Sequence, residues 1–269
     1  MPRAGRTGWT EPLFSAADKP PGMDLLVVGA GEMGRWLARA LDEDADVPVA
    51  VTFHDADPAA AEAAAEGCEA TSTEDPDAGH DAVCIAVPIP AAAEAIARFA
   101  PLAEGAVFDV TGTMATPLAA MADHAADREQ CSLHPLFAPA NEPGSVAAVL
   151  AERGPTTATV LEALEARGND VFETTAGEHD RAMETVQARA HTAVLAYGLA
   201  AEAVDERFHT PVSSGLEGLL EQVTDGESRV YADIQDAFDG AEDVADAAER
   251  LAGADRDEFR RLYEDAGPR

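Results

Sequence analysis

Lysine is nearly absent from this sequence. The 269 residues include 51 acidic and 18 basic side chains, and Lys19 is the single lysine. The formal net charge is −33, and the acids are spread along the whole chain. A nucleic-acid-binding surface requires clustered Lys and Arg, so we expect no nucleic-acid partner. Concentrated salt would screen self-repulsion of this size, and a diffuse acidic surface almost free of lysine is typical of cytoplasmic proteins of salt-accumulating halophiles.

Cysteine and long hydrophobic runs are also scarce. The three cysteines, Cys68, Cys84 and Cys131, form no CxxC pair. They indicate neither a disulfide framework nor a structural zinc site, so we expect a cytoplasmic protein without a metal. No stretch approaches about 18 consecutive apolar residues, which excludes a membrane span. Residues 1–22 lack the apolar segment of a signal peptide, and we predict that they form a disordered N-terminal tail.

A glycine-rich turn follows the first apolar run of the chain. Residues 25–41 read LLVVGAGEMGRWLARAL, in which Gly29, Gly31 and Gly34 form a GxGxxG motif between a strand pattern and a helix pattern. The first glycine allows a tight turn, the second lets the backbone approach a pyrophosphate, and the third lets the helix pack on the strand. The turn therefore predicts a dinucleotide site. Its residues are Gly29, Ala30, Gly31, Glu32, Met33 and Gly34.

An acidic residue at the end of the next strand pattern indicates which dinucleotide binds. The run VPVAVTFHD ends at Asp55, 21 residues beyond Gly34. A carboxylate there accepts hydrogen bonds from ribose hydroxyls and repels a 2′-phosphate, so NAD is favoured over NADP. A later strand pattern ends in the VPIP turn, and we expect Val87 and Pro88 to line the same cofactor site at the carboxyl edge of the sheet.

Strand and helix patterns alternate from residue 23 to residue 176. Apolar runs at 47–55, 81–90, 105–112 and 131–137 are separated by helical patterns. This alternation predicts an α/β fold, a Rossmann-type doubly wound parallel sheet that binds the dinucleotide. From residue 177 to residue 269 only helical patterns occur, which predicts a second, all-α domain.

One histidine lies where the predicted sheet would bind a ligand. The segment CSLHPLFAPA places His134 before a proline, which favours extended backbone and ends the strand there. A histidine in this place can simply terminate a strand. Because the carboxyl ends of the strands carry the ligand site in such sheets, we favour a functional role for His134.

Polar residues recur along the long helical pattern from residue 178 to residue 204. Asp180, Gln187 and His191 fall within about 20° of one direction on a regular helix. They form either a hydrogen-bonded network in the core or part of a site. His179 and His191 are about 18 Å apart along the axis and cannot share a metal ion. We expect His179 to cap or orient the start of the helix.

Several motifs together resemble one enzyme family. GAGEMGRW, CIAVPIP, DVTG, HPLFAP, EHDRAMETVQARAH and VYADIQ are similar to segments of the prephenate dehydrogenases of tyrosine biosynthesis, over residues 23–265. The resemblance implies an NAD-binding domain followed by a helical domain that binds substrate and forms a homodimer. It also implies oxidative decarboxylation of prephenate to 4-hydroxyphenylpyruvate.

The resemblance assigns roles to individual residues. His134 would accept the proton of the ring hydroxyl as hydride leaves, a role that suits a neutral imidazole. His191, with Gln187 one turn earlier, would contact the substrate, and Asp180 would orient the site or hold a helix start. No metal is needed, because formation of the aromatic ring drives the loss of CO₂.

Three positions depart from the family pattern. Members of the family often carry Ser and Lys where this chain has Gly112 and Met114, and often an arginine where it has Gln222. Prephenate carries two carboxylates, which need cationic or N–H partners when buried. These departures keep two alternatives open. One is an arogenate dehydrogenase, and the other is a non-catalytic NAD-binding regulatory protein.

Overall fold

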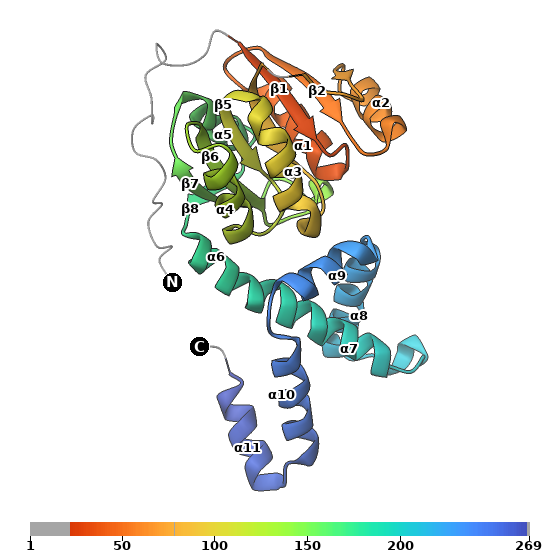
Figure 1. Cartoon of the computed structure of the whole chain (residues 1–269). Coiled ribbons are helices and arrows are strands. Elements are labelled where there is room, and N and C mark those ends of the chain that lie inside the picture. Colours follow the sequence, from red (N-terminus) through yellow and green to blue (C-terminus); the bar gives the residue numbers. More distant parts are fainter. Residues whose placement is uncertain (1–21, 78, 268–269) are drawn as a thin grey trace. The chain divides into compact units, whose positions relative to one another are not determined.

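A mostly parallel sheet of eight strands organises the first part of the chain in the computed structural model, which describes residues 22–77 and 79–267 (Figure 1). The strand order is β3-β2-β1-β4-β5-β6-β7-β8. The predicted tail, residues 1–22, lies outside the described residues except for Gly22. The strands are β1 (Met23–Val28), β2 (Val49–His54), β3 (Thr71–Ser72), β4 (His80–Ile85), β5 (Ala103–Asp109), β6 (Glu129–Pro135), β7 (Ser145–Glu152) and β8 (Asp170–Glu173).

Helices cover both faces of this sheet. In β1, Leu25 and Val27 belong to a buried cluster with α1, α2 and α5, whereas Leu26 and Val28 belong to a second cluster with α3 and α4. Successive side chains of a strand point to opposite faces, so a strand that is covered on both sides is apolar throughout. The predicted α/β class is confirmed. The helices are α1 (Glu32–Asp44), α2 (Pro58–Gly67), α3 (Ala92–Phe99), α4 (Ala115–His124) and α5 (Pro155–Ala166).

The sheet departs from the predicted parallel arrangement at one edge. Strand β7 pairs antiparallel with β6, and β8 pairs parallel with β7, so the last two strands run against the others. The link from β6 to β7 contains only a short 3₁₀ turn, Pro139–Asn141. A parallel neighbour requires a crossover connection of a dozen or more residues, and this short link permits only an antiparallel one.

The chain divides into two compact units between Asp180 and Arg181, and the second unit is helical. The helical segments that follow β8 are α6 (Ala176–Met183), a π-helical segment (Glu184–Arg189), α7 (Ala190–Ala200), α8 (Pro211–Thr224), α9 (Ser228–Ala237), α10 (Ala241–Gly253) and α11 (Arg256–Asp265). The second unit is all-α, as predicted, although the long helix ends at Ala200 and not at residue 204. The π-helical segment also breaks the regular 100° spacing that placed Asp180, Gln187 and His191 on one stripe.

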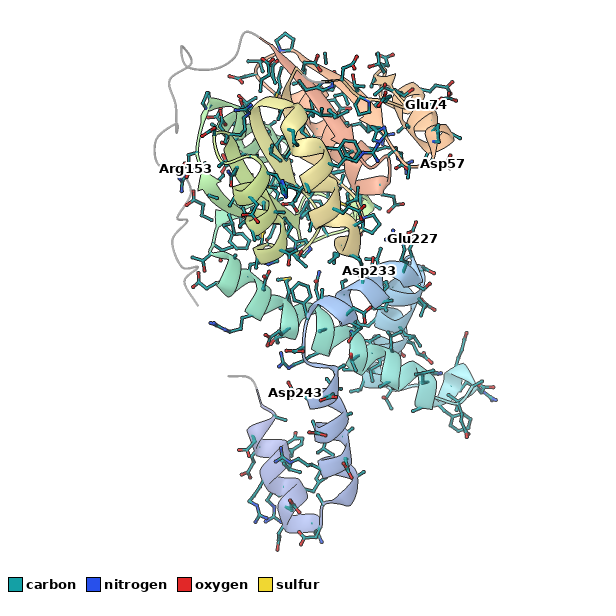
Figure 2. All side chains as sticks on the ribbon, in the orientation of Figure 1. Asp57, Glu74, Arg153, Glu227, Asp233 and Asp243 are labelled. Carbon is teal, nitrogen blue, oxygen red and sulfur yellow. The ribbon has the colours of Figure 1, made fainter. Side chains whose placement is uncertain are left out.

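Acidic side chains project from both units (Figure 2). Asp57 and Glu74 are labelled around α2 in the first unit, and Glu227, Asp233 and Asp243 in the second (Figure 2). Within the described part of the chain, no helix is both long and apolar enough to cross a membrane.

Candidate active site

The glycine-rich turn between β1 and α1 is too crowded for side chains at two positions. Gly29 has a positive φ of 106°, and a Cβ on it would overlap the carbonyl oxygen of Ala86. A Cβ on Gly34 would overlap the carbonyl oxygen of Gly29. The first and third glycines of the motif are therefore required by the turn itself and by the close approach of α1 to β1.

The middle glycine faces open space. Nothing lies within 4 Å of the position that a Cβ on Gly31 would take, and Gly31 precedes α1 without a side-chain cap. The first turn of α1 contains Glu32 and Met33, and the N–H groups of a first helical turn have no partner within the helix. A helix N-terminus of this kind binds phosphate groups, so the turn fits a dinucleotide pyrophosphate.

Asp55 follows β2, and the turn itself orients its carboxylate. Ala30 N–H donates to Asp55 Oδ2 at 2.8 Å, and Asp57 N–H donates to Asp55 Oδ1 at 2.9 Å. A carboxylate oxygen has two lone pairs, so each oxygen can still accept from a ribose hydroxyl. The two bonds hold Asp55 beside the glycine-rich turn, where the sequence predicts it. Val87 and Pro88 follow β4 after Ala86; Val87 is partly buried and Pro88 is exposed.

A chain of hydrogen bonds links His134 on β6 to the start of another helix. His134 Nδ1 lies 2.8 Å from His179 Nε2, and His179 Nδ1 lies 2.8 Å from Asp180 Oδ1. The Asp180 carboxylate also accepts from the N–H of Met114 at 3.1 Å and of Ala115 at 3.2 Å. These backbone groups belong to the start of α4. Asp180 therefore holds a helix start, one of its two predicted roles, but the helix is α4 and not the one that contains Asp180.

His179 does not cap the start of α6, which is one of its two expected roles. The start of α6 is capped by Thr175, whose Oγ1 accepts from Glu178 N–H at 3.2 Å. His179 is instead only 3% exposed, between His134 and Asp180. The sequence contains one signal for this contact, the HD dipeptide within EHDRAM. Its partner is 45 residues away in sequence, so helix periodicity could not reveal the pair.

Gly112 lies against the other nitrogen of the His134 ring. Its φ is +96°, and a Cβ built on it would lie 3.4 Å from His134 Nε2. The side of the imidazole that faces Gly112 is therefore the side away from His179. The turn after β5 thus brings Gly112 and His134 together at the carboxyl edge of the sheet, as expected for a ligand site.

Burial keeps the His134 imidazole neutral. Burial and, to a smaller extent, the neighbouring His179 lower the pKa of His134 to about 3, although Asp180 acts to raise it. Burial alone would raise the pKa of Asp180, but hydrogen bonds from His179, Met114 and Ala115 outweigh this effect and lower it. At neutral pH the site thus contains an ionised carboxylate and a neutral His134, which can accept a proton.

A second carboxyl group is buried one strand away. Asp109 ends β5 and is fully buried, and its Oδ1 accepts from the Thr111 N–H at 3.0 Å and from the Thr111 hydroxyl at 2.7 Å. Burial raises the pKa of Asp109 to about 7, although the hydrogen bonds from Thr111 and Ser132 act to lower it. Sequence reasoning missed this group, because the DVTG motif resembles an ordinary strand end.

The second unit holds Gln187 and His191. His191 on α7 packs its ring edge-on against Tyr231 on α9, with 4.9 Å between the ring centroids, and burial lowers its pKa. Gln235 from the VYADIQ motif fixes α9 to this helix, because its amide donates to the Ala188 carbonyl at 3.1 Å and accepts from the Thr192 hydroxyl at 3.1 Å. The motif therefore positions the aromatic ring that contacts His191.

The remaining predicted residues are distributed as follows. Gln222 is exposed on α8. Arg189, between Gln187 and His191 in sequence, pairs with Asp243 and Glu184. Within the first unit the structure brings together His134, Gly112 and Asp180, and within the second it places Gln187 and His191 on one helical stretch.

Sequence comparison identifies the family. No family model matches the chain. A 4-amino-4-deoxyprephenate dehydrogenase from Streptomyces pristinaespiralis is 32% identical over 243 residues, which cover 82% of this chain and 79% of that protein. The chain belongs to the prephenate dehydrogenase family. The resemblance seen in the motifs is thereby confirmed, and the chain is an oxidoreductase.

Solved structures of prephenate and arogenate dehydrogenases share the fold. A prephenate dehydrogenase from Aquifex aeolicus, in complex with hydroxyphenyl propionate and NAD⁺, has a TM-score of 0.67 at 14% identity, covering 90% of this chain and 92% of that chain. An arogenate dehydrogenase from Synechocystis has a TM-score of 0.55 at 15% identity, covering 90% and 97%. These solved dehydrogenases thus share with this chain an α/β sheet that is followed by a helical part.

Proposed function

We propose that the chain catalyses the NAD-dependent oxidative decarboxylation of prephenate to 4-hydroxyphenylpyruvate. The observation that carries the proposal is the neutral His134, whose Nε2 lies beside Gly112 at the carboxyl edge of the sheet. Family membership supplies the reaction class, and the glycine-rich turn with Asp55 supplies a site for the dinucleotide.

The residues of the chain account for the steps that need a protein group. Bound NAD⁺ supplies the hydride acceptor. As hydride leaves the ring carbon that bears the hydroxyl, His134 Nε2 accepts the hydroxyl proton and so favours the developing C=O bond. The bond to the ring carboxylate breaks, its electron pair enters the ring, and CO₂ leaves. His134 then returns the proton to the phenolic oxygen, so the residue is regenerated in each turnover.

NAD is the proposed cofactor in preference to NADP. The Asp55 carboxylate lies beside the glycine-rich turn, fixed by the N–H groups of Ala30 and Asp57. It would repel a 2′-phosphate and accept from a 2′-hydroxyl.

Substrate contacts on the helical side are also proposals. His191 and Gln187 would bind the cyclohexadienyl substrate, as the family resemblance implies. Arg229 on α9 is a candidate partner for a substrate carboxylate, although it now pairs with Asp233 at 3.1 Å and Glu227 at 3.3 Å. Arg181, which directly follows Asp180 in the HDR segment, is a second candidate.

A second candidate substrate is 4-amino-4-deoxyprephenate. The curated relative with 32% identity is named for this compound. In addition, Gly112 leaves the Nε2 side of His134 without the hydroxyl that a serine would offer there. An imidazole lone pair accepts from an amine N–H as well as from a hydroxyl, so the geometry suits either substituent on the ring.

We also propose a homodimer that forms through the second unit and functions in the cytoplasm. Several large apolar side chains of that unit are exposed, among them Leu199, Phe208, Val212 and Tyr263. Large apolar side chains that are exposed in one subunit can be buried where two subunits associate. Light scattering with size-exclusion chromatography should give twice the chain mass of 28.0 kDa, whereas a monomer would contradict the proposal.

The decisive experiment is NADH formation followed by absorbance in multimolar KCl with prephenate, arogenate or 4-amino-4-deoxyprephenate. Turnover that is fastest with prephenate supports the proposed function. Turnover that is fastest with the amino compound would assign the second candidate. If the protein binds NADH and none of the three substrates reacts, the catalytic proposal is wrong.

A further inference from the structure

We propose that His179 and Asp180 are positioning residues that fix the tautomer of His134, so that Nε2 is unprotonated before substrate binds. The inference rests on the proposed role of His134 as proton acceptor and adds two residues that do not touch the reacting atoms. It assigns Asp180 to the support of His134 and not to direct contact with the substrate.

The direction of each hydrogen bond in the series His134–His179–Asp180 follows from the carboxylate of Asp180. An ionised carboxylate only accepts, so His179 Nδ1, 2.8 Å from Asp180 Oδ1, must carry a proton. In the proposed arrangement His179 is a neutral imidazole whose one N–H is on Nδ1, so its Nε2 accepts. His134 Nδ1, 2.8 Å away, must then donate. One proton remains assigned to Nδ1 of His134, and the lone pair is therefore on Nε2, the nitrogen beside Gly112.

Asp180 is held in its charged form by the start of α4. The N–H groups of Met114 and Ala115, at 3.1 and 3.2 Å, donate to its two oxygens, and the partial positive charge of a helix N-terminus favours the anion. The same bonds fix the position of the carboxylate. Because the Asp180 carboxylate stays charged and in place, it determines the tautomer of His179, and His179 in turn determines the tautomer of His134.

The departures from the family pattern fit this arrangement. Members of the family often carry serine where this chain has Gly112, and a glycine offers no hydroxyl to the His134 ring. At the opposite edge of the ring His179 and His134 are both buried, 3% and 8% exposed, and the hydrogen bond between them fixes the position of Nδ1. In a buried network of this type the hydrogen-bond partners fix the orientation of each ring, because few other arrangements satisfy all of the donors and acceptors.

Two substitutions of His179 separate the bonds. In His179→Asn the amide nitrogen takes the place of Nδ1 and can still donate to Asp180, but the side chain is too short to reach His134. In His179→Gln the amide reaches His134 and can accept from its Nδ1–H, which preserves the tautomer. Asp180→Asn replaces one accepting oxygen by a donor and allows both histidines to change tautomer. In a protease triad the comparable Asp-to-Asn change lowers turnover about 10⁴-fold.

The chain offers a matched control. His80 Nδ1 lies 2.9 Å from Asp24 Oδ1 at the beginning of β4, away from the carboxyl edge of the sheet. His80→Ala removes a His–Asp pair of nearly the same length, 2.9 Å against 2.8 Å, without touching His134. We expect its kcat to stay within about twofold of that of the parent protein, because partly exposed pairs contribute little.

The experiment measures kcat together with the ¹⁵N chemical shifts of the His134 ring in the full-length protein. We expect the Nδ1–H tautomer of His134 in the parent protein. In Asp180→Asn, kcat should fall by at least about 100-fold and the tautomer should shift toward Nε2–H. A similar loss of kcat is expected in His179→Asn, whereas kcat of His179→Gln should recover to within about tenfold of the parent value. Loss of kcat without a change of tautomer, or a change of tautomer without loss, would overturn the proposal. So would an Nε2–H tautomer in the parent protein.

Two checks keep the outcome interpretable. Far-UV circular dichroism and NADH affinity show whether each variant is folded. If the His179 variants do not fold, the ring tautomer of the parent protein decides alone. Failure of the proposed function is a separate result, because the parent protein would then turn over none of the three substrates while the ¹⁵N shifts still report the tautomer.

Discussion

Replacement of Asp109 by asparagine should change how stability depends on pH. Asp109 is fully buried, and burial raises its pKa from an ordinary value of 3.8 to about 7. Asparagine has nearly the same shape, and its Oδ1 can still accept from the N–H and hydroxyl of Thr111. The substitution therefore removes one titration and leaves the packing almost unchanged.

The sign of the effect follows from proton binding. Between pH 3.8 and pH 7 the folded protein keeps the Asp109 proton, whereas the unfolded chain releases it. The stabilisation from the protonated, buried carboxyl group is therefore fully present below the unfolded pKa and is lost as the pH rises through the folded pKa. With these two pKa values, the loss between pH 5 and pH 8 is about 3 kcal/mol. The asparagine variant does not have this loss.

The assay is thermal unfolding of both proteins at pH 5 and pH 8 in multimolar KCl. The Tm of Asp109→Asn relative to the parent should rise by roughly 5–10 °C between the two pH values, because 1 kcal/mol shifts Tm by about 2–4 °C at this chain length. All other titrations are common to both proteins and cancel in the difference. A difference in Tm that is the same at both pH values would refute the reasoning and show that Asp109 is ionised throughout.

Four further predictions concern the site. His134→Asn should lower kcat by about 10²–10⁴-fold and leave the NADH affinity nearly unchanged, whereas an equal loss of both would make His134 a structural residue. Because burial lowers the pKa of His134 to about 3, kcat/KM should show no fall from protonation of this residue between pH 8 and pH 5, and a His134-dependent fall near pH 6 would contradict the geometry. Asp55→Ser should raise the ratio of kcat/KM with NADP to that with NAD by about tenfold or more, and an unchanged ratio would remove Asp55 from the ribose site. Gly112→Ser should lower kcat by about tenfold, because φ is +96° and the new Cβ would lie 3.4 Å from His134 Nε2; full activity would show that the turn accommodates a side chain.

Local pattern was sufficient for much of the fold. The apolar run at residues 25–28, the three glycines and the following helix appear in the structure in the predicted order, because the turn has steric demands that only glycine meets at Gly29 and Gly34. The position of Asp55 at the end of β2 could also be predicted, since it depends on a short strand and on the register of parallel neighbours.

Other features depend on contacts between distant segments. The direction of β7 follows from a short link whose path no periodicity describes. The π-helical segment Glu184–Arg189 interrupts a pattern that reads as a continuous α-helix.

The support of His134 shows the same division between sequence and tertiary structure. A histidine near the end of β6 could be predicted from the sequence, because the following proline restricts its backbone. The contact with His179 and Asp180 could not, since side chains 45 residues apart meet through the packing of α6 against the sheet and the start of α4. Backbone preferences act between neighbours in sequence, whereas the tautomer of a buried imidazole depends on whichever groups the fold brings to its two nitrogens.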